Sequence, residues 1–302
     1  MSTLRICLLG DIALRGAMSN VLRFPTKKSK SLFAYLVIYK ERTFARVTLA
    51  GKFWPESEEG KAHRNLNTEI WRLRTMFRSS GLEPETFLHS DHDSIGFRRE
   101  SDHWVDVAEF DALTQALSAH HTPPTRAVLL PTLAKAVTLY RGDLLEGLFD
   151  DWCLVQREAY RARLMAALEV LLATTMEAEH WQDAIGHGQR LLELDPLQEH
   201  VHRALMRCHV SLGNRPAALK QFAACERILR DELQIEPMDE TRQLFETLNL
   251  AQRVSPPNAE RPVTEPDHAR ARRVEVALAS LSTARLWLEH ASRQLQGEGD
   301  PK

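Results

Sequence analysis

Residues 46–78 read RVTLAGKFWPESEEGKAHRNLNTEIWRLRTMFR, in which an acidic loop separates two helical patterns. The first pattern covers residues 46–53 and ends at Trp54–Pro55, because a proline ring disfavours the helical conformation in the residue before it. The second pattern predicts a helix from Lys61 to Arg78, and the acidic residues before it stabilise the positive end of the helix dipole. The stripe of this helix that we expect to be buried consists of Ala62, Leu66, Ile70 or Glu69, Leu73 and Phe77.

Shorter patterns on both sides of this helix pair complete a winged helix-turn-helix. Two apolar segments, residues 4–14 and 21–24, predict paired strands. Residues 27–40 carry apolar side chains at helical spacing and predict a first helix. Residues 87–97 predict a hairpin around the polar turn HSDHD. Strand, helix, helix, helix and hairpin is the order of a winged helix, which we assign to residues 1–105.

The polar faces of the second helix carry side chains that suit the reading of DNA. Arg64, Asn67, Thr68 and Trp71 fall on one face, and arginine pairs with guanine as asparagine does with adenine in the major groove. Neighbouring basic residues suit phosphates, which position a protein without reading sequence. The residues that we expect to contact DNA are Lys27, Lys28, Lys30, Lys61, His63, Arg64, Asn67, Thr68, Trp71, Arg72, Arg74, Arg78, Arg98 and Arg99.

A solvated surface is the alternative explanation for any basic helix face. Within this helix, however, Glu69 is the single acidic residue among four arginines, so most of the positive charge has no partner there. Trp71 is either exposed beside Arg72 or part of the core. Charge is also uneven along the chain: residues 1–100 carry a net charge of +6, whereas the whole chain carries -2. That asymmetry is typical of a DNA reader joined to a protein-interaction module, although chance could also produce it.

From residue 106 to 251 the pattern is helical almost without a break. Two stretches repeat at an offset of 34 residues, which places Ala184 on Ala218 and Leu191 on Cys225. A 34-residue period with small residues at the helix crossing is typical of tetratricopeptide repeats. We therefore predict a mainly α protein with a small β portion: a winged helix followed by an all-α, tetratricopeptide-like domain and a C-terminal helix. An ordinary helical bundle is the alternative for the second domain.

The last part of the chain predicts a linker and one long helix. Residues 252–267 are rich in proline and polar residues, and residues 268–297 carry apolar residues in steps of three and four. This heptad pattern predicts a dimerisation helix, and the alternative is a helix that folds back on its own repeat domain. The residues expected to mediate oligomerisation are Val274, Ala277, Leu281, Ala284, Leu288, Ala291 and Leu295.

Motifs of catalysis are missing from the sequence. It contains no phosphate-binding loop, dinucleotide fingerprint, zinc-protease motif or nucleophile elbow, so we expect neither an enzyme nor a cofactor. His89 and His92 could attract a divalent ion, but a wing turn is polar in any case, and we predict no metal site. Four scattered cysteines and no long apolar run predict a cytoplasmic protein with no membrane span and no signal peptide.

Two further stretches complete a resemblance to a known family. Residues 46–77, with Trp54–Pro55 and Leu73–Arg74, resemble the helix-turn-helix of the antibiotic-regulatory-protein family of bacterial activators, a branch of the OmpR-type winged helices. WVDVAEFDAL, residues 104–113, and LYRGDLLEGLFDDW, residues 139–152, are similar to the bacterial transcriptional activation domain of that family.

The resemblance implies a regulator that binds direct repeats in double-stranded DNA and recruits RNA polymerase. Lys61–Arg78 would be the recognition helix, and the loop with Ser57, Glu58 and Glu59 would face the polymerase. The repeat domain would help to form a homodimer or bind an effector.

Two alternatives to this reading remain. One is a protein-interaction scaffold built on the tetratricopeptide-like domain. The other is a regulator gated by a small anionic ligand in the repeat domain, although pairing with nearby acids is the commoner explanation for each arginine there. The arginines that could meet such a ligand are Arg161, Arg163, Arg190, Arg203 and Arg207.

Overall fold

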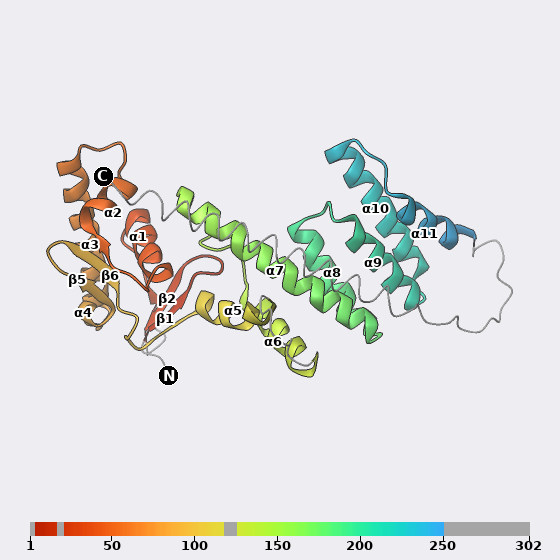
Figure 1. Ribbon diagram of the computed structural model, residues 1–302, viewed down its shortest axis with the longest axis horizontal. Coiled ribbons are helices and arrows are strands. Elements are labelled where there is room, and N and C mark those ends of the chain that lie inside the picture. Colours follow the sequence, from red (N-terminus) through yellow and green to blue (C-terminus); the bar gives the residue numbers. More distant parts are fainter. Residues whose placement is uncertain (1–3, 17–20, 118–125, 251–302) are drawn as a thin grey trace. The chain divides into compact units, whose positions relative to one another are not determined.

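A computed structural model describes residues 4–16, 21–117 and 126–250. The predicted linker and heptad helix, residues 252–267 and 268–297, lie outside the described residues. The chain divides into two compact units, each of which combines segments that are distant in sequence (Figure 1). Among the described residues, those within 4–113 and 138–160 form the first unit, and those within 114–137 and 161–250 form the second.

The first unit begins with a four-stranded sheet in the order β3-β2-β1-β7. Its strands are β1 (Leu4–Cys7), β2 (Ala13–Gly16), β3 (Val21–Leu22) and β7 (His103–Val105). β1 pairs antiparallel with β2, as predicted, and it pairs in parallel with β7 on its other side. The strand β7 was not predicted, because three residues in a polar context give no alternating pattern to recognise.

The predicted winged helix-turn-helix follows and is confirmed. Its helices are α1 (Lys27–Ile38), α2 (Arg46–Phe53), α3 (Glu59–Ser79) and the short α4 (Pro84–Phe87). The wing consists of β5 (Leu88–Ser90) and β6 (Ser94–Phe97), and β6 also pairs with β4 (Phe44–Ala45). In the core, the ring of Phe33 on α1 lies 5.9 Å from that of Phe77 on α3 and 6.0 Å from that of Phe97 on β6.

The boundaries of α3 differ slightly from the prediction. The helix begins at Glu59, two residues before Lys61, so Glu59 and Gly60 belong to its first turn and not to the preceding loop. A carboxylate in the first turn interacts favourably with the helix dipole, which explains why the helix extends into the acidic stretch. Glu69 and Ile70 are both buried, and Trp71 is 63% exposed, which settles the two positions that the sequence left open.

The first unit also contains the segment around LYRGDLLEGLFDDW. A backbone bridge joins Leu9 to Leu144, and the N–H of Leu145 donates to the carbonyl of Leu8 at 2.8 Å. A Cβ atom on Gly142 would lie 3.1 Å from the Cα of Gly10, so these two segments of the chain approach closely and a larger residue would push against the backbone. This contact places residues 138–160 in the first compact unit.

A buried carboxylate strengthens the same contact. Asp106, at the start of α5 (Asp106–Thr114), accepts hydrogen bonds from the backbone N–H groups of Leu8, Leu9 and Val107 at 2.7 to 3.0 Å. Desolvation raises the pKa of the Asp106 carboxyl, and these three donors oppose that shift. Asp106 thereby ties the end of β1 to the start of α5.

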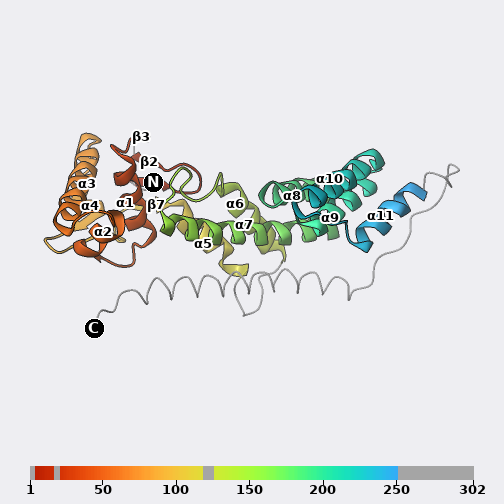
Figure 2. The ribbon, with the colours of Figure 1, turned by 90° about the horizontal axis from the view of Figure 1, so that it is seen from above.

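The second unit is helical. Its elements include η1 (Gln115–Leu117), most of α6 (Arg126–Leu139), the later part of α7 (Asp151–Glu177), α8 (Trp181–Leu194), α9 (Glu199–Ser211), α10 (Arg215–Leu233) and α11 (Asp239–Leu250). α9 packs between α8 and α10, and α11 packs on α10 (Figure 2). α8 and α10 begin at Trp181 and Arg215, which preserves the 34-residue offset.

Small residues allow the repeat helices to pack closely, as the tetratricopeptide pattern predicts. Ala184 and Ala218 are both fully buried. A Cβ atom on Gly188 of α8 would lie 2.7 Å from Cδ2 of Leu205 on α9, so this crossing requires glycine. The tetratricopeptide-like fold of the second domain is thus confirmed.

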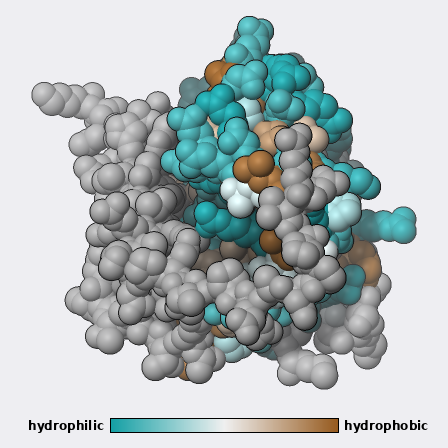
Figure 3. Space-filling view, turned by 90° about the vertical axis from the view of Figure 1, so that its right-hand side faces the viewer, coloured by the Kyte–Doolittle hydropathy of each residue, from teal (hydrophilic) through white to brown (hydrophobic). Residues whose placement is uncertain are grey.

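One face of the molecule is mostly polar where it can be seen. On the face in Figure 3, the residues that are not drawn in grey are largely hydrophilic, with a few hydrophobic residues between. The exposed large hydrophobic residues of the second unit include Val210, Leu212, Leu233, Ile235, Met238 and Leu250. Within the described residues, no helix combines the length and the apolar character that crossing a membrane requires.

All four cysteines are buried and free. Burial raises the pKa of Cys208 to about 11 and that of Cys153 and Cys225 to about 12. A thiol is reactive as its thiolate, so these groups act as small packing residues.

Candidate nucleic-acid interface

The exposed side chains of α3 recur every three or four residues and form one stripe along the helix. A buried apolar stripe on the opposite side anchors the helix to the unit, which leaves this face toward solvent. Seven members of the exposed stripe are Lys61, Arg64, Asn67, Thr68, Trp71, Thr75 and Arg78. Thr75 was not among the residues predicted from the sequence, although it continues the same spacing; His63 is only half-exposed.

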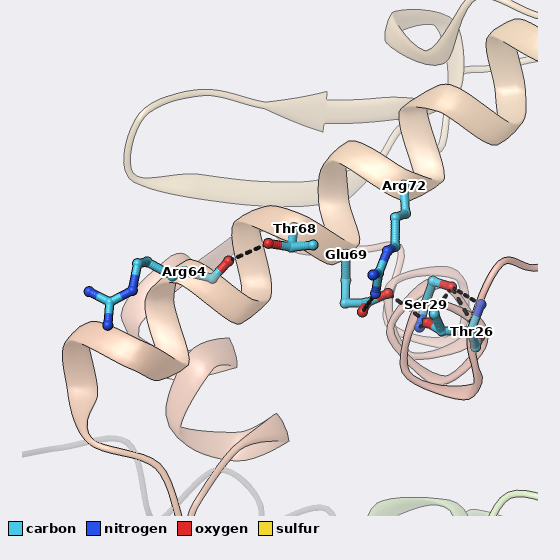
Figure 4. A network of polar contacts seen from close by, with 6 residues as sticks. All are labelled: Thr26, Ser29, Arg64, Thr68, Glu69 and Arg72. Carbon is cyan, nitrogen blue, oxygen red and sulfur yellow. Dashed lines mark hydrogen bonds and ion pairs between the residues drawn. The ribbon is translucent and has the colours of Figure 1, made fainter.

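The N-terminal half of the stripe keeps its long basic side chains unpaired. Among the described residues, neither Lys61 nor Arg64 has a carboxylate within ion-pair distance. The hydroxyl of Thr68 donates to the backbone carbonyl of Arg64 at 2.9 Å, while the Arg64 guanidinium extends away from the helix (Figure 4). This half therefore presents cationic donors that remain available to a ligand.

A buried carboxylate fixes the middle of α3. Oε2 of Glu69 accepts from the hydroxyl of Thr26 at 2.7 Å, and Oε1 accepts from Arg72 at 2.5 Å (Figure 4). Thr26 is also the N-cap of α1, where its hydroxyl accepts from the N–H of Ser29 and completes a capping box. Glu69 thus ties α3 to the first turn of α1 and holds one of the predicted phosphate ligands, Arg72, against the protein.

The C-terminal half of α3 has an acidic partner from outside the helix. Glu85 on α4 accepts from Arg74 at 2.5 Å and from Arg78 at 3.2 Å. Hydrogen bonds from its own backbone and from Arg74 lower the pKa of Glu85. The sequence argument counted acids within α3 and so missed Glu85, which lies 11 residues from Arg74 along the chain.

A second arginine network joins α3 to the wing. Arg46, the first residue of α2, donates to Oδ1 of Asn67 at 2.6 Å, to the hydroxyl of Ser90 at 2.8 Å and to the carbonyl of Asp91 at 3.0 Å. Sequence reasoning did not select Arg46. In the sequence, Arg46 is recognisable only as the residue that follows a short strand, and this position does not predict a role at the interface.

The turn of the wing is held by its own polar groups. The Asp91 carboxylate accepts from the backbone N–H groups of Asp93 and Ser94 and from the Ser94 hydroxyl. The hydrogen bonds from Ser94 are the main reason that the pKa of Asp91 is lowered to about 2. His89 and His92 hydrogen-bond to Asp91 and Asp93, respectively. These interactions give the turn a defined shape next to Arg46.

The other predicted contacts are distributed over several elements. Lys28 pairs with Asp150 at 3.4 Å, and Lys30 pairs with Asp11. Arg99 on the segment after β6 pairs with Glu41 and Glu100. Lys27 and Arg98 are exposed, as are Glu58 and Glu59, whereas Ser57 is half-buried. The structure therefore gathers the α3 residues into one stripe but leaves several outlying cations with acidic partners.

The arginines of the second unit that were considered for an anionic ligand are engaged within the protein. Arg161 donates to the carbonyl of Leu194, and Arg190 pairs with Glu193 at 2.7 Å. Arg203 donates to the hydroxyl of Thr241 at 2.9 Å and lies 3.5 Å from Glu199. These contacts match the commoner explanation, pairing with nearby groups.

Comparison with known proteins identifies the domain that follows the winged helix. The family model of the bacterial transcriptional activator domain matches residues 105–249. The chain carries a bacterial transcriptional activator domain. This domain follows a winged helix, which is the arrangement of the antibiotic-regulatory proteins, so the resemblance found in the sequence is confirmed.

Proteins that are similar to this chain in sequence are regulators. The regulatory protein AfsR of Streptomyces coelicolor is 24% identical over 210 residues, which cover 70% of this chain and 20% of AfsR. The transcriptional regulatory protein MoaR1 of Mycobacterium tuberculosis is 23% identical over 248 residues, which cover 78% of this chain and 75% of MoaR1. The chain thus spans about a fifth of AfsR and three quarters of MoaR1.

A solved structure shares the fold. Mycobacterium tuberculosis EmbR, determined in complex with a low-affinity phosphopeptide, matches with a TM-score of 0.67 and 19% sequence identity. The match covers 94% of this chain and 71% of the EmbR chain. It supports the order of a winged helix followed by a tetratricopeptide-like domain.

Proposed function

We propose that the protein is a sequence-specific transcription regulator that binds double-stranded DNA through α3. The observation that carries this proposal is the exposed stripe of α3, whose N-terminal half presents Lys61, Arg64, Asn67, Thr68 and Trp71 on a helix held by a buried opposite face. An α-helix fits the major groove, where each base pair presents its own pattern of donors and acceptors. The function is therefore one of binding and not of catalysis.

The two halves of α3 would contribute differently to that binding. In helix-turn-helix proteins the N-terminal residues of the recognition helix contact base edges. We accordingly assign base contacts to Arg64, Asn67 and Thr68, and phosphate contacts to Arg78 and the wing residue Arg98. Arg72 and Arg74 act first through their carboxylate partners, which position the helix.

The proposal also covers how the protein activates transcription and how its DNA sites are arranged. By its likeness to the antibiotic-regulatory proteins, the chain would bind direct repeats and contact RNA polymerase. The exposed carboxylates of Glu58, the N-cap of α3, and Glu59, its first residue, lie next to the half-buried Ser57 and would face the polymerase.

Selection of genomic fragments would test the proposal. The purified protein is incubated with fragmented DNA of its source at about 150 mM salt, because contacts with phosphates alone weaken steeply as salt rises. We expect enrichment of fragments that share a motif in spaced direct repeats. Enrichment without a motif would show only a basic surface, and no enrichment would overturn the proposal.

A homodimer is part of the proposed assembly. The heptad residues from Val274 to Leu295 would form its interface, with alanines allowing a close approach of two helices. Replacement of Leu281 and Leu288 by aspartate should lower the mass measured by sedimentation equilibrium. An unchanged mass would favour the alternative in which this segment folds back on its own chain.

A further inference from the structure

The contact between Arg46 and Asn67 sets which hydrogen bonds Asn67 can offer to DNA. An asparagine amide has an acceptor oxygen and a donor NH₂ group, whereas a guanidinium donates only. The group that Arg46 meets at 2.6 Å is therefore Oδ1. This contact occupies one of the two lone pairs of Oδ1 and leaves both N–H donors of Nδ2 free for a ligand.

The Arg46 side chain is held from the wing, so that it does not depend on DNA for its position. Its Nε donates to the carbonyl of Asp91 at 3.0 Å and one terminal nitrogen donates to the hydroxyl of Ser90 at 2.8 Å. Its backbone N–H donates to the carbonyl of Asp93 at 2.8 Å. The guanidinium is thus fixed on two sides before Asn67 contacts a ligand.

An asparagine whose oxygen already accepts from a cation reads the major groove differently from a free one. Selection of adenine by asparagine uses both ends of the amide, with Oδ1 accepting from N6 of the base and Nδ2 donating to N7. The positive charge of the guanidinium beside Oδ1 disfavours the approach of the partly positive N6 amino group of adenine. Guanine, by contrast, presents two acceptors, N7 and O6, to a donor.

We propose that Arg46 is a specificity-determining residue that makes Asn67 a hydrogen-bond donor, so that Asn67 selects guanine and not adenine at one position of the operator. This inference rests on the proposed function and concerns one base pair within the site. Arg46 acts through Asn67 and need not contact a base itself.

Base substitution at each position of the operator would test the inference. The four bases are placed at every position of the selected site, and the affinity of each duplex is measured for the wild type and for Asn67→Ala. At the position where Asn67→Ala removes the preference, the wild type should bind guanine about tenfold more tightly than adenine, as expected for one good base contact. A wild-type preference for adenine at that position would overturn the inference.

A change in Arg46 should redirect this preference without abolishing binding. Arg46→Met releases Oδ1, and the preference should move toward adenine at that position and at no other. Ser90→Ala is the matched control, because it removes a wing contact of Arg46 but keeps the contact with Asn67. An unchanged preference in a folded Arg46→Met protein would overturn the inference.

Modified DNA supplies a test that leaves the protein intact. Replacement of the selected guanine by 7-deazaguanine removes the N7 acceptor and should weaken wild-type binding several-fold, with no effect on Asn67→Ala. Equal binding of both duplexes by the wild type would contradict the donor role. If Arg64→Ala loses sequence preference while Asn67→Ala alters no position, the inference fails and the proposed function stands. If the wild type selects no motif at all, both fail.

Discussion

The two halves of α3 carry similar residues but place them in different electrostatic surroundings. In the N-terminal half, Lys61 and Arg64 have no acidic partner among the described residues. In the C-terminal half, Arg74 and Arg78 share the carboxylate of Glu85. In the proposed DNA complex, exposure of a basic side chain would not be enough by itself, because a neighbouring acid decides how much of its charge a phosphate can use.

The difference between the halves also separates support from recognition. Glu69 and Arg72 fix the middle of the helix to the rest of the unit, and Arg46 fixes its N-terminal half to the wing. Base readout requires that side chains be held within narrow geometric limits. Under the proposed function, the anchoring contacts would therefore determine how well the unpaired residues discriminate between DNA sequences.

The largest expected effect comes from Arg64 in the unpaired half. Arg64→Ala should reduce the free energy of binding to the selected operator by about 1–3 kcal/mol, the value of one good base contact, and change random-sequence binding much less. Fluorescence anisotropy with both duplexes measures the two effects. The control is Arg78→Ala, which should weaken both duplexes alike. Identical behaviour of the two variants would remove the distinction between the halves.

A smaller effect, on the stability of the fold, is expected when the Glu69 carboxylate that anchors the middle of α3 is removed. Glu69→Ala leaves Arg72 and the hydroxyl of Thr26 without their acceptor, and should lower the free energy of unfolding by about 1–3 kcal/mol. Urea denaturation followed by circular dichroism measures it. Glu59→Ala, which changes an exposed glutamate of the same helix, is the control. Equal stability of both variants would show that the Glu69 network does not anchor α3.

Release of the paired arginines should make the C-terminal half resemble the N-terminal half. Glu85→Gln leaves Arg74 and Arg78 without a carboxylate, so the affinity for operator and random DNA should rise together by a few-fold. The dependence of affinity on salt should become steeper, since more phosphate contacts release more counterions. Gains restricted to the operator would indicate that Glu85 acts on base recognition instead.

The smallest expected effect is a loss of stability of the wing turn at low pH. This turn lies beside the N-terminal half of α3. The pKa of Asp91 is about 2 in the folded protein, below the ordinary value of about 3.9. Ionised Asp91 therefore contributes stability above about pH 4, and that contribution is lost as the pH falls toward 2. An NMR titration of the Asp91 carboxyl should give this low midpoint, and Ser94→Ala should raise it. A midpoint near 3.9 in the wild type would mean that the turn is not held by Asp91.

Sequence patterns predicted the helices better than the pairing of their charged residues. α2 was predicted with its observed bounds, and the buried residues of α3 followed the predicted stripe. The partners of Arg74 and Asn67 were missed, because Glu85 and Arg46 lie on other elements. Helical periodicity is a local property, whereas an ion pair between elements depends on how those elements pack.

The amino-acid sequence by itself determined the winged helix, the exposed basic face of α3 and the 34-residue offset of the repeat helices. These features arise from the spacing of apolar residues over one or two turns, which decides the buried face of each helix. The tertiary structure alone decided the parallel pairing of β1 with β7, the packing of residues 138–160 in the first unit and the partners of each arginine. Those contacts join residues far apart in sequence, and only the packing of the folded core brings them together.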